Sequence, residues 1–381
     1  MKRGLSILLF CILFVQCKET RPRNAIPLFE NGQGAYACYR IPAIIKSSDG
    51  SLLAFAEGRT NNCADFGDVD ILLRRSSDGG ATWSLPKVVA SFHNLQAGNP
   101  APVVDRLDPN YPEGRIFLFY NTGDVSEQEL RLGKGTREVW YKTSVDHGRS
   151  WSKGINITPQ VHFNGSASQA EKDWRTHATT PGHALQFEKG KHKGRLYIPA
   201  NHSQGPPQEN FNEYRAYGFY SDDHGGSWNV SPDVDIPSSN EAIGVELSNG
   251  TLMLNIREQS GRSHLRLIAL STSGGSSWEK TYFDPALISP VCQSSLLPFV
   301  SNQDTLLIYS GPDSREKRER MSLKISPDQG KTWSHTLLID PGAAAYSDMV
   351  QIDPNHLGLL YEKASDGIVF QSISSNRLLL K

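Results

Sequence analysis

Residues 76–83 read Ser76-Ser77-Asp78-Gly79-Gly80-Ala81-Thr82-Trp83, and this stretch decides the fold because near-copies of it recur along the chain. The shared pattern, called an Asp box below, is Ser-x-Asp-x-Gly-x-Thr/Ser-Trp. The other four copies are Ser144–Trp151, Ser221–Trp228, Ser271–Trp278, which has Ser273 in place of Asp, and Ser326–Trp333. The copies begin 68, 77, 50 and 55 residues apart. Repeats at such intervals are typical of arrays, solenoids and propellers.

The local chemistry of each Asp box predicts a β-hairpin turn. Asp caps backbone N–H groups and Gly accepts a positive φ, so the two residues suit a tight turn. A β-rich run precedes each box, for example Ile71-Leu72-Leu73 before the first, and the Trp begins the returning strand. One hairpin cannot bury its apolar face alone, whereas several arranged radially form a β-propeller. We therefore assign the Asp residues of the boxes to turn structure and not to catalysis.

The two ends of the chain predict the number of blades. The run 368–374 resembles the strand that precedes each Asp box, and 25–29 can add to the same sheet and close the ring. The sequence therefore predicts an all-β, six-bladed β-propeller that occupies residues 25–381 as one domain. Two polar stretches, 159–180 and 201–213, are too long for hairpin turns, and we expect them to overhang one face and shape a binding site.

The first residues have the pattern of an export signal. The basic start Met1-Lys2-Arg3 precedes the apolar run Leu5–Val15, which is too short to span a bilayer as a mature helix. We interpret residues 1–17 as a signal peptide, either of the lipoprotein type with acylation of Cys17 or of the ordinary type cut nearby. Residues 18–24 are polar and are predicted to form a tether. Both interpretations predict an exported protein: periplasmic, anchored to the outer membrane as a lipoprotein, or secreted.

The number of cysteines and the net charge limit the disulfides, partners and metal sites that the sequence can support. After export, Cys38, Cys63 and Cys292 remain, so at most one disulfide forms within the chain. A Cys38–Cys63 pair and buried free thiols are both open. The 39 basic and 40 acidic residues balance, which argues against nucleic acid as the main partner. No spacing typical of a metal site occurs among the cysteines, histidines or Asp boxes, and no metal is predicted.

A stretch near the start makes the pattern specific. Tyr39-Arg40-Ile41-Pro42, followed by the Asp boxes, resembles the exo-sialidases (neuraminidases), in their bacterial branch. The similarity covers essentially the whole mature chain. It implies sialylated glycoproteins, glycolipids or oligosaccharides as substrates.

The resemblance implies three arginines that bind the carboxylate of sialic acid. A guanidinium is always charged and can bind two oxygens at once, so arginine fits this task better than lysine. Arg40 corresponds to the first and Arg257 to the second. Arg318 corresponds to the third, with Arg315 and Arg320 as open alternatives in the same charged run.

The same resemblance implies a general acid on the loop that precedes the first Asp box. The role falls on Asp65, with Asp68 and Asp70 as alternatives. An acid that works near neutral pH needs a raised pKa, and we expect desolvation and the neighbouring carboxylates to raise it. Arg59 resembles a family arginine that lines the pocket near the sugar.

The family nucleophile is a tyrosine, an exception among glycosidases, most of which use two carboxylates. The anomeric carbon of sialic acid bears a carboxylate, so an attacking carboxylate would meet like charge, whereas a phenol is neutral until a base activates it. Tyr346, before Ser347-Asp348, matches this tyrosine. In the family the base is a glutamate, and the family's spacing to the second arginine favours Glu241 over Glu246.

These residues together predict a retaining exo-α-sialidase. Asp65 protonates the leaving glycosidic oxygen, Glu241 takes the phenol proton of Tyr346, and the phenolate attacks the anomeric carbon. Water then releases the sugar from the covalent intermediate. The scheme needs no cofactor, and it leaves His183 and His202 without a necessary role.

Two other functions remain open at this level. A non-catalytic, glycan-binding propeller would use the arginine pocket only to hold an acidic sugar, and it would be expected to lack Asp65, Glu241 or Tyr346. A sialidase variant would transfer sialic acid to another sugar or release an anhydro product by intramolecular attack. Linkage preference depends on loop shapes that the sequence does not define.

Overall fold

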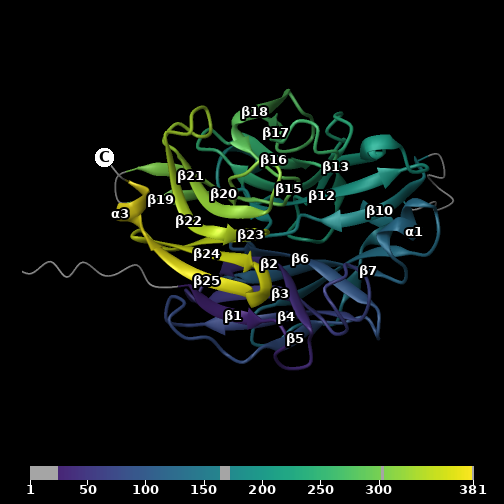
Figure 1. The fold of residues 1–381 in the computed structure, drawn as a ribbon, viewed down its shortest axis with the longest axis horizontal. Coiled ribbons are helices and arrows are strands. Elements are labelled where there is room, and N and C mark those ends of the chain that lie inside the picture. Colours follow the sequence, from purple (N-terminus) through teal and green to yellow (C-terminus); the bar gives the residue numbers. More distant parts are fainter. Residues whose placement is uncertain (1–24, 164–171, 302–303, 380–381) are drawn as a thin grey trace, which may run out of the picture.

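The computed structural model describes residues 25–163, 172–301 and 304–379. Within these ranges the chain consists of β-strands joined by turns and a few short helices (Figure 1). None of the helices found there has both the length and the apolar composition that crossing a bilayer requires. The predictions about residues 1–17, Cys17 and the tether 18–24 lie outside the described residues.

The strands of the first half are β1 (Ile26–Glu30), β2 (Cys38–Lys46), β3 (Leu52–Arg59), β4 (Val69–Ser76), β5 (Lys87–Ala90), β6 (Gln96–Asp105), β7 (Arg115–Gly123), β8 (Arg137–Ser144), β9 (Ile155–Asn156), β10 (Trp174–Thr179), β11 (Leu185–Gln186) and β12 (Leu196–Gln204). Those of the second half are β13 (Tyr214–Ser221), β14 (Asn229–Val230), β15 (Ser239–Glu246), β16 (Leu252–Glu258), β17 (Leu265–Ser271), β18 (Lys280–Ile288), β19 (Ser295–Val300), β20 (Thr305–Pro312), β21 (Glu319–Ser326), β22 (His335–Ala343), β23 (Ser347–Asp353), β24 (His356–Lys363) and β25 (Gly367–Ser374). The α-helices are α1 (Glu127–Arg131), α2 (Thr158–Val161) and α3 (Ser375–Leu378).

The strands form five hydrogen-bonded sheets, so the predicted count of six blades is wrong, whereas the all-β class is confirmed. Four sheets have the size of a single propeller blade: β1-β25-β24-β23, β15-β16-β17-β18, β19-β20-β21-β22 and β10-β12-β13-β14 with β11 beside β12. The remaining strands, β2 to β9, form one eight-stranded sheet. The physical reason is a parallel pairing of β4 with β6 at Val69 and Gln96, which joins two hairpin units that the sequence pattern separates.

The two ends of the described chain meet in one sheet. β1 pairs antiparallel with β25, with Ile26 opposite Phe370 and Glu30 opposite Gly367. Figure 1 shows the same arrangement, with purple β1 next to yellow β25. The predicted addition of the first strand to the last sheet is therefore confirmed. This pairing covers an edge of the last sheet that would otherwise expose unpaired backbone groups.

The Asp boxes form the turns that the sequence predicted for them. In the first box, Asp78 accepts hydrogen bonds from the backbone N–H of Thr82 (2.9 Å) and from its hydroxyl (2.6 Å). The hydroxyl of Ser76 accepts from the backbone N–H of Gly80 (2.8 Å), whose φ is 88°. The second, third and fifth boxes repeat this arrangement. These carboxylates are therefore occupied by their own turns.

Each Asp-box turn also packs against the neighbouring sheet. A Cβ on Gly80 would lie 2.3 Å from the ring of Phe370, and one on Gly225 would lie 2.7 Å from the ring of Phe117. Glycine at this position is thus required both by its positive φ and by the close approach of an aromatic ring. The turns lie at one end of the strands, and the first residues of the inner strands β2, β15 and β23 lie at the other end, where they border the site described next.

Candidate active site

The centre of the site is a hydrogen-bonded triad of Tyr346, Glu241 and Arg257. Tyr346 directly precedes β23, Glu241 lies near the start of β15, and Arg257 lies near the end of the adjacent β16. The Tyr346 hydroxyl donates to Glu241 Oε1 (2.5 Å), and Arg257 Nη1 donates both to Glu241 Oε2 (2.6 Å) and to the Tyr346 hydroxyl (2.9 Å). The structure therefore brings Tyr346 to a pair on adjacent strands, from which it is separated by 89 and 105 residues in the sequence.

The surroundings of Tyr346 keep its phenol protonated. Burial raises its pKa, and the negative charge of Glu241 raises it further. Arg257, Arg318 and Arg40 act in the opposite direction, and the net result is a pKa well above the ordinary value. In this arrangement the phenol is the hydrogen-bond donor and Glu241 is the acceptor to which a proton can pass.

Two further arginines approach the same ring. Arg40 Cζ lies 5.1 Å and Arg318 Cζ 5.6 Å from the centre of the Tyr346 ring. Together with Arg257, they place all three predicted carboxylate-binding arginines around one phenol. Arg315 and Arg320, the open alternatives, are exposed, and neither makes a cation–π contact or hydrogen bond with Tyr346 in the described part of the chain.

Arg40 is held by a glutamate that the sequence analysis did not single out. Glu362 accepts from Arg40 Nε (3.1 Å) and Nη2 (3.2 Å), and its Oε1 also accepts from the backbone N–H of Ile41 (2.9 Å). Glu362 lies at the end of β24, which belongs to the last sheet. The signal that could have found it is a carboxylate at the end of the apolar run Leu359-Leu360-Tyr361, since buried charges are rarely left unpaired.

A second missed glutamate orients Arg59. Glu57 Oε2 accepts from Arg59 Nε (3.1 Å) and Nη2 (2.7 Å), and both side chains are almost fully buried. The two residues are two apart on β3 and therefore lie on the same face of the strand. Arg59 Nη1 is left to reach the Asp65 loop, where it donates to the Cys63 carbonyl (2.7 Å) and to Asp65 Oδ1 (2.8 Å).

Asp65 lies on the loop between β3 and β4, next to two of the predicted arginines. Its Oδ1 accepts from Arg59 Nη1 and from Arg40 Nη1 (3.2 Å), while its side chain is 80% exposed. A Cys38–Cys63 disulfide, which the sequence left open, ties this loop to the start of β2. The carboxyl group thus lies beside two arginines of the site and is accessible to a ligand.

The expected rise in the pKa of Asp65 does not occur. Although much of the side chain is exposed, desolvation by the surrounding protein would raise the pKa; the positive charges of Arg59 and Arg40 outweigh this effect and leave the pKa below its ordinary value. Of the alternatives, Asp70 accepts from the Tyr36 hydroxyl (2.7 Å), and burial raises its pKa. Asp68 is half-buried on the same loop and forms no ion pair with an arginine in the described part of the chain. Only Asp65 of the three contacts the arginines of the site.

Glu246, the alternative to Glu241, lies at the opposite end of β15. Its carboxylate accepts from the backbone N–H groups of Glu188 (2.8 Å) and Lys189 (3.1 Å). It lines a cavity of about 320 Å³ on the face where the Asp-box turns lie. The structure therefore places Glu241, and not Glu246, beside Tyr346.

The backbone below Tyr346 is fixed by a buried carboxylate, Asp348. Its two oxygens accept from the backbone N–H groups of Ile44 (2.9 Å) and His183 (3.0 Å), from His183 Nδ1 (2.7 Å) and from the Ser295 hydroxyl (2.8 Å). These partners belong to β2, to the segment before β11, and to β19. One carboxylate thus holds the segment after Tyr346 against several sheets, and His183 is occupied in a structural pair.

Cys292 is buried against Tyr346 and Ile41. Burial raises the pKa of its thiol to about 11. The thiol is therefore protonated near neutral pH and is a poor nucleophile, because the thiolate is the reactive form.

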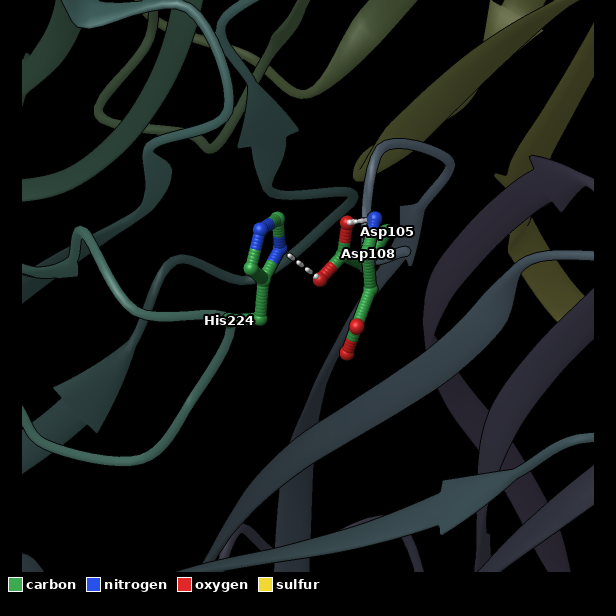
Figure 2. Close-up of side chains that lie close together, drawn as sticks. All are labelled: Asp105, Asp108 and His224. Atoms are coloured by element: carbon green, nitrogen blue, oxygen red, sulfur yellow. Dashed lines mark hydrogen bonds and ion pairs between the residues drawn. The ribbon is translucent and has the colours of Figure 1, made fainter. Parts of the chain in front are cut away.

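The described residues contain one group of side chains with potential metal ligands, which Figure 2 shows. His224 Nδ1 lies 2.8 Å from Asp105 Oδ2, and Gln186 Nε2 donates to the other oxygen of Asp105 (2.6 Å). Asp108 accepts from Arg115 Nη2 (2.9 Å). The potential ligand atoms are thus hydrogen-bonded to protein partners, one of which is a cationic arginine. This arrangement fits a structural contact between the third Asp box and the end of β6 better than a metal centre.

Comparison with known proteins identifies the family. Residues 50–359 match the family described as a BNR repeat-like domain. The chain is 31% identical to a sialidase from Micromonospora viridifaciens, over 87% of this chain and 51% of that protein. It is 30% identical to Sialidase-2 from Cricetulus griseus, over 90% of this chain and 93% of that protein. This chain belongs to the sialidase family.

A solved structure agrees with this assignment. The Hadza microbial sialidase Hz136 superposes with a TM-score of 0.77 at 26% identity, covering 91% of this chain and 67% of that one. The sialidase family of glycoside hydrolases, predicted from Tyr39-Arg40-Ile41-Pro42 and the Asp boxes, is therefore confirmed. The chain spans about half the length of the Micromonospora relative and 64% of a sialidase from Bacteroides fragilis.

Proposed function

We propose that this chain is a retaining exo-α-sialidase that removes terminal sialic acid from sialylated glycans through a tyrosyl intermediate. The observation that carries the proposal is the 2.5 Å hydrogen bond from Tyr346 to Glu241, at the centre of three guanidinium groups. A nucleophile, a base and a binding site for a carboxylate meet at one point. Membership of the sialidase family supports the same reaction.

The three arginines select the substrate by its charge. The carboxylate of sialic acid would be bound by Arg40, Arg257 and Arg318. Glu362 already pairs with Arg40 and Glu241 with Arg257, so two of the three charges are partly compensated before substrate arrives. A neutral sugar would leave the remaining positive charge unpaired, which disfavours its binding.

Tyrosine suits this anomeric carbon because a neutral phenol is not repelled by the adjacent carboxylate. Glu241 Oε1 receives the phenol proton as the Tyr346 oxygen attacks. Arg257 Nη1, at 2.9 Å from that oxygen, stabilises the phenolate that develops. The pKa of the resting phenol lies well above the ordinary value, so the proton has to leave as the new bond forms and not before it.

Asp65 would protonate the glycosidic oxygen as the bond to the leaving group breaks. Its pKa is low in the free protein because Arg59 and Arg40 contact it. A bound substrate carboxylate takes over Arg40, so Asp65 loses one of two cationic partners and gains a negative neighbour. Both changes raise its pKa toward the range that a general acid needs.

The second half of the reaction reverses these roles. Asp65, now ionised, removes a proton from water, which attacks the anomeric carbon on the face that the leaving group left. The bond to Tyr346 breaks, Glu241 returns its proton to the phenolate, and two inversions give net retention. The protein's own residues account for each proton in this scheme.

The first experiment compares wild type with Tyr346→Phe on a fluorogenic α-sialoside. We expect wild type to release free sialic acid as the α-anomer in the first moments, followed by proton NMR, and the variant to lose about 10³-fold in kcat. Equal turnover by both would discard Tyr346 as nucleophile. If folded wild type binds sialylated glycans without turnover, a non-catalytic glycan-binding propeller is favoured. If the product is an anhydro sugar or a transferred sialic acid, the reaction is intramolecular release or transfer and not hydrolysis.

We also propose that the protein is exported. The Cys38–Cys63 disulfide supports this, because disulfides persist in oxidising compartments and are rare in reducing ones. The mass of the mature N-terminus, measured on protein from the native host, tests export and acylation of Cys17 together. A full-length chain that begins at Met1 would contradict the proposal.

A further inference from the structure

A second groove lies near the catalytic pocket but outside it. It has a volume of about 690 Å³, within the range of small-ligand sites. Its walls come from the segment before β13, from β13 itself and from the hairpins of β16 to β18. One wall residue, Glu258, directly follows Arg257 on β16, so their side chains leave the strand on opposite faces, Arg257 toward Tyr346 and Glu258 toward the groove.

Two arginines in this groove have no acidic partner in the described part of the chain. Arg215 Nη1 donates to the backbone carbonyls of Asn212 (2.7 Å) and Tyr214 (2.8 Å). Arg262 donates to the hydroxyl of Ser260 (3.1 Å) and, at 3.4 Å, to Asn212 Oδ1. All of these contacts are to neutral oxygens, so neither guanidinium group is engaged in an ion pair within the described residues.

The one carboxylate of the groove is already occupied. Glu258 accepts hydrogen bonds on both oxygens, from the backbone and hydroxyl of Ser260 and from the backbone (3.1 Å) and hydroxyl (3.1 Å) of Ser263. Glu258 therefore stabilises the turn between β16 and β17 and does not pair with either arginine. Two guanidinium groups and one carboxylate therefore line the groove.

The remaining walls suit a sugar. Phe283, on β18, is 38% exposed and offers an aromatic surface for the apolar face of a pyranose ring. The side-chain amide of Gln208 is exposed and can form hydrogen bonds with the hydroxyl groups of a sugar. Cationic guanidinium, neutral amide and aromatic ring are the three elements needed to bind an acidic sugar.

We propose that this groove is a second, non-catalytic binding site for a carboxylate-bearing sugar. The inference rests on the proposed function in one respect, since a glycan with several sialylated branches then supplies both ligands. One branch occupies the catalytic pocket and another occupies the groove, so the second contact is intramolecular and raises the effective concentration of substrate. The site would favour multiply sialylated glycans over single sialosides.

The kinetic test uses Arg215→Gln/Arg262→Gln beside Arg149→Gln, an exposed arginine of the second Asp-box turn. On a glycoprotein with multiply sialylated branches, we expect the double variant to raise KM about tenfold with kcat unchanged. On a small fluorogenic α-sialoside, wild type, the double variant and Arg149→Gln should have KM and kcat values within about twofold of one another. Phe283→Ala, which leaves the arginine contacts intact, should also raise KM for the glycoprotein. It keeps the proposal testable if the double variant does not fold.

Calorimetric titration with N-acetylneuraminic acid separates the two proposals. Wild type should bind two molecules and the double variant one. Two binding events in a wild type that hydrolyses nothing would retain the groove and discard the proposed reaction. A single event in wild type, or equal KM values for the glycoprotein in wild type, the double variant and Phe283→Ala, would overturn the groove and leave the reaction standing.

Discussion

Individual charges in the pocket are stabilised by partners from distant parts of the chain. Arg40 and Glu362 are the clearest case, because they are 322 residues apart and form two hydrogen bonds in a partly buried place. Removal of one member of such a pair leaves the other charge uncompensated, and the cost exceeds the net value of the pair. The same argument applies to Arg59 and Glu57.

Substitution of Glu362 by Gln should therefore affect both stability and binding. Arg40 loses its ion pair and its fixed orientation, so we expect a loss of about 3 kcal/mol in the free energy of unfolding and a KM for an α-sialoside raised about tenfold. Urea unfolding and steady-state kinetics measure the two effects. Glu316→Gln, at an exposed position, is the matched control. Wild-type behaviour of Glu362→Gln would mean that the backbone alone positions Arg40.

The low pKa of Asp65 predicts a difference between two pH profiles. The profile of kcat/KM reports the free protein, in which Arg59 and Arg40 lower the pKa of Asp65, and the profile of kcat reports the complex. As pH rises, kcat/KM should fall first, because the protonated acid is lost at lower pH in the free protein. The limb in kcat should lie at higher pH, since the substrate carboxylate has taken Arg40. Coincident limbs, or a limb retained in Asp65→Asn, would contradict this explanation.

At the scale of elements, the fourth Asp box shows how a turn compensates for a missing carboxylate. Ser273 stands where the other boxes have Asp, and its hydroxyl lies 2.8 Å from that of Ser277. Glu279 supplies the negative charge instead: it accepts from the Ser277 hydroxyl (2.6 Å) and from the backbone N–H of Thr272 (2.7 Å). The hydrogen bond to Ser277 and the other contacts lower the pKa of Glu279.

Glu279→Gln should accordingly destabilise the protein by about 1 kcal/mol, and Ser273→Asp in the same background should restore the loss. Because the folded pKa of Glu279 is lowered, its contribution is present at neutral pH and disappears as pH falls through that lowered pKa. Thermal unfolding at neutral and acidic pH measures both effects. A difference between wild type and Glu279→Gln that grows toward acidic pH would have the wrong sign and would refute the assignment.

The whole molecule is closed by its first strand, and the closure is open to a direct test. Phe29 on β1 is 1% exposed, and its ring centre lies 5.6 Å from that of Tyr39. Phe29→Ala should cost about 3–5 kcal/mol in the free energy of unfolding, because a large buried ring is lost from the seam between the first and last strands. Leu85→Ala, at a position 85% exposed, should change it by less than about 0.5 kcal/mol. Equal effects in denaturant unfolding would show that β1 adds nothing to closure.

The sequence predicted local chemistry better than long-range pairing. The Asp-box turns follow from Asp and Gly within eight residues, and the strand addition of β1 follows from its apolar composition. The number of sheets does not, because one parallel pair at Val69 and Gln96 leaves no mark in a pattern of hairpins. Desolvation and the carboxylates near it in sequence predict a raised pKa for Asp65; desolvation acts in that direction, but its neighbours in space are guanidinium groups, which outweigh it.

The direction in which β1 enters the last sheet also determines on which side of the molecule the preceding chain is attached. Ile26 pairs with Phe370, whose ring packs on Gly80 and Trp83 of the first Asp box, while Glu30 lies toward the end of β25 that adjoins the catalytic face. Whatever precedes Ile26 is therefore joined to the molecule on the side of the turns. A segment attached at that side leaves the opposite end of the strands, where Tyr346, Glu241 and Arg257 meet, unobstructed by the chain that precedes β1.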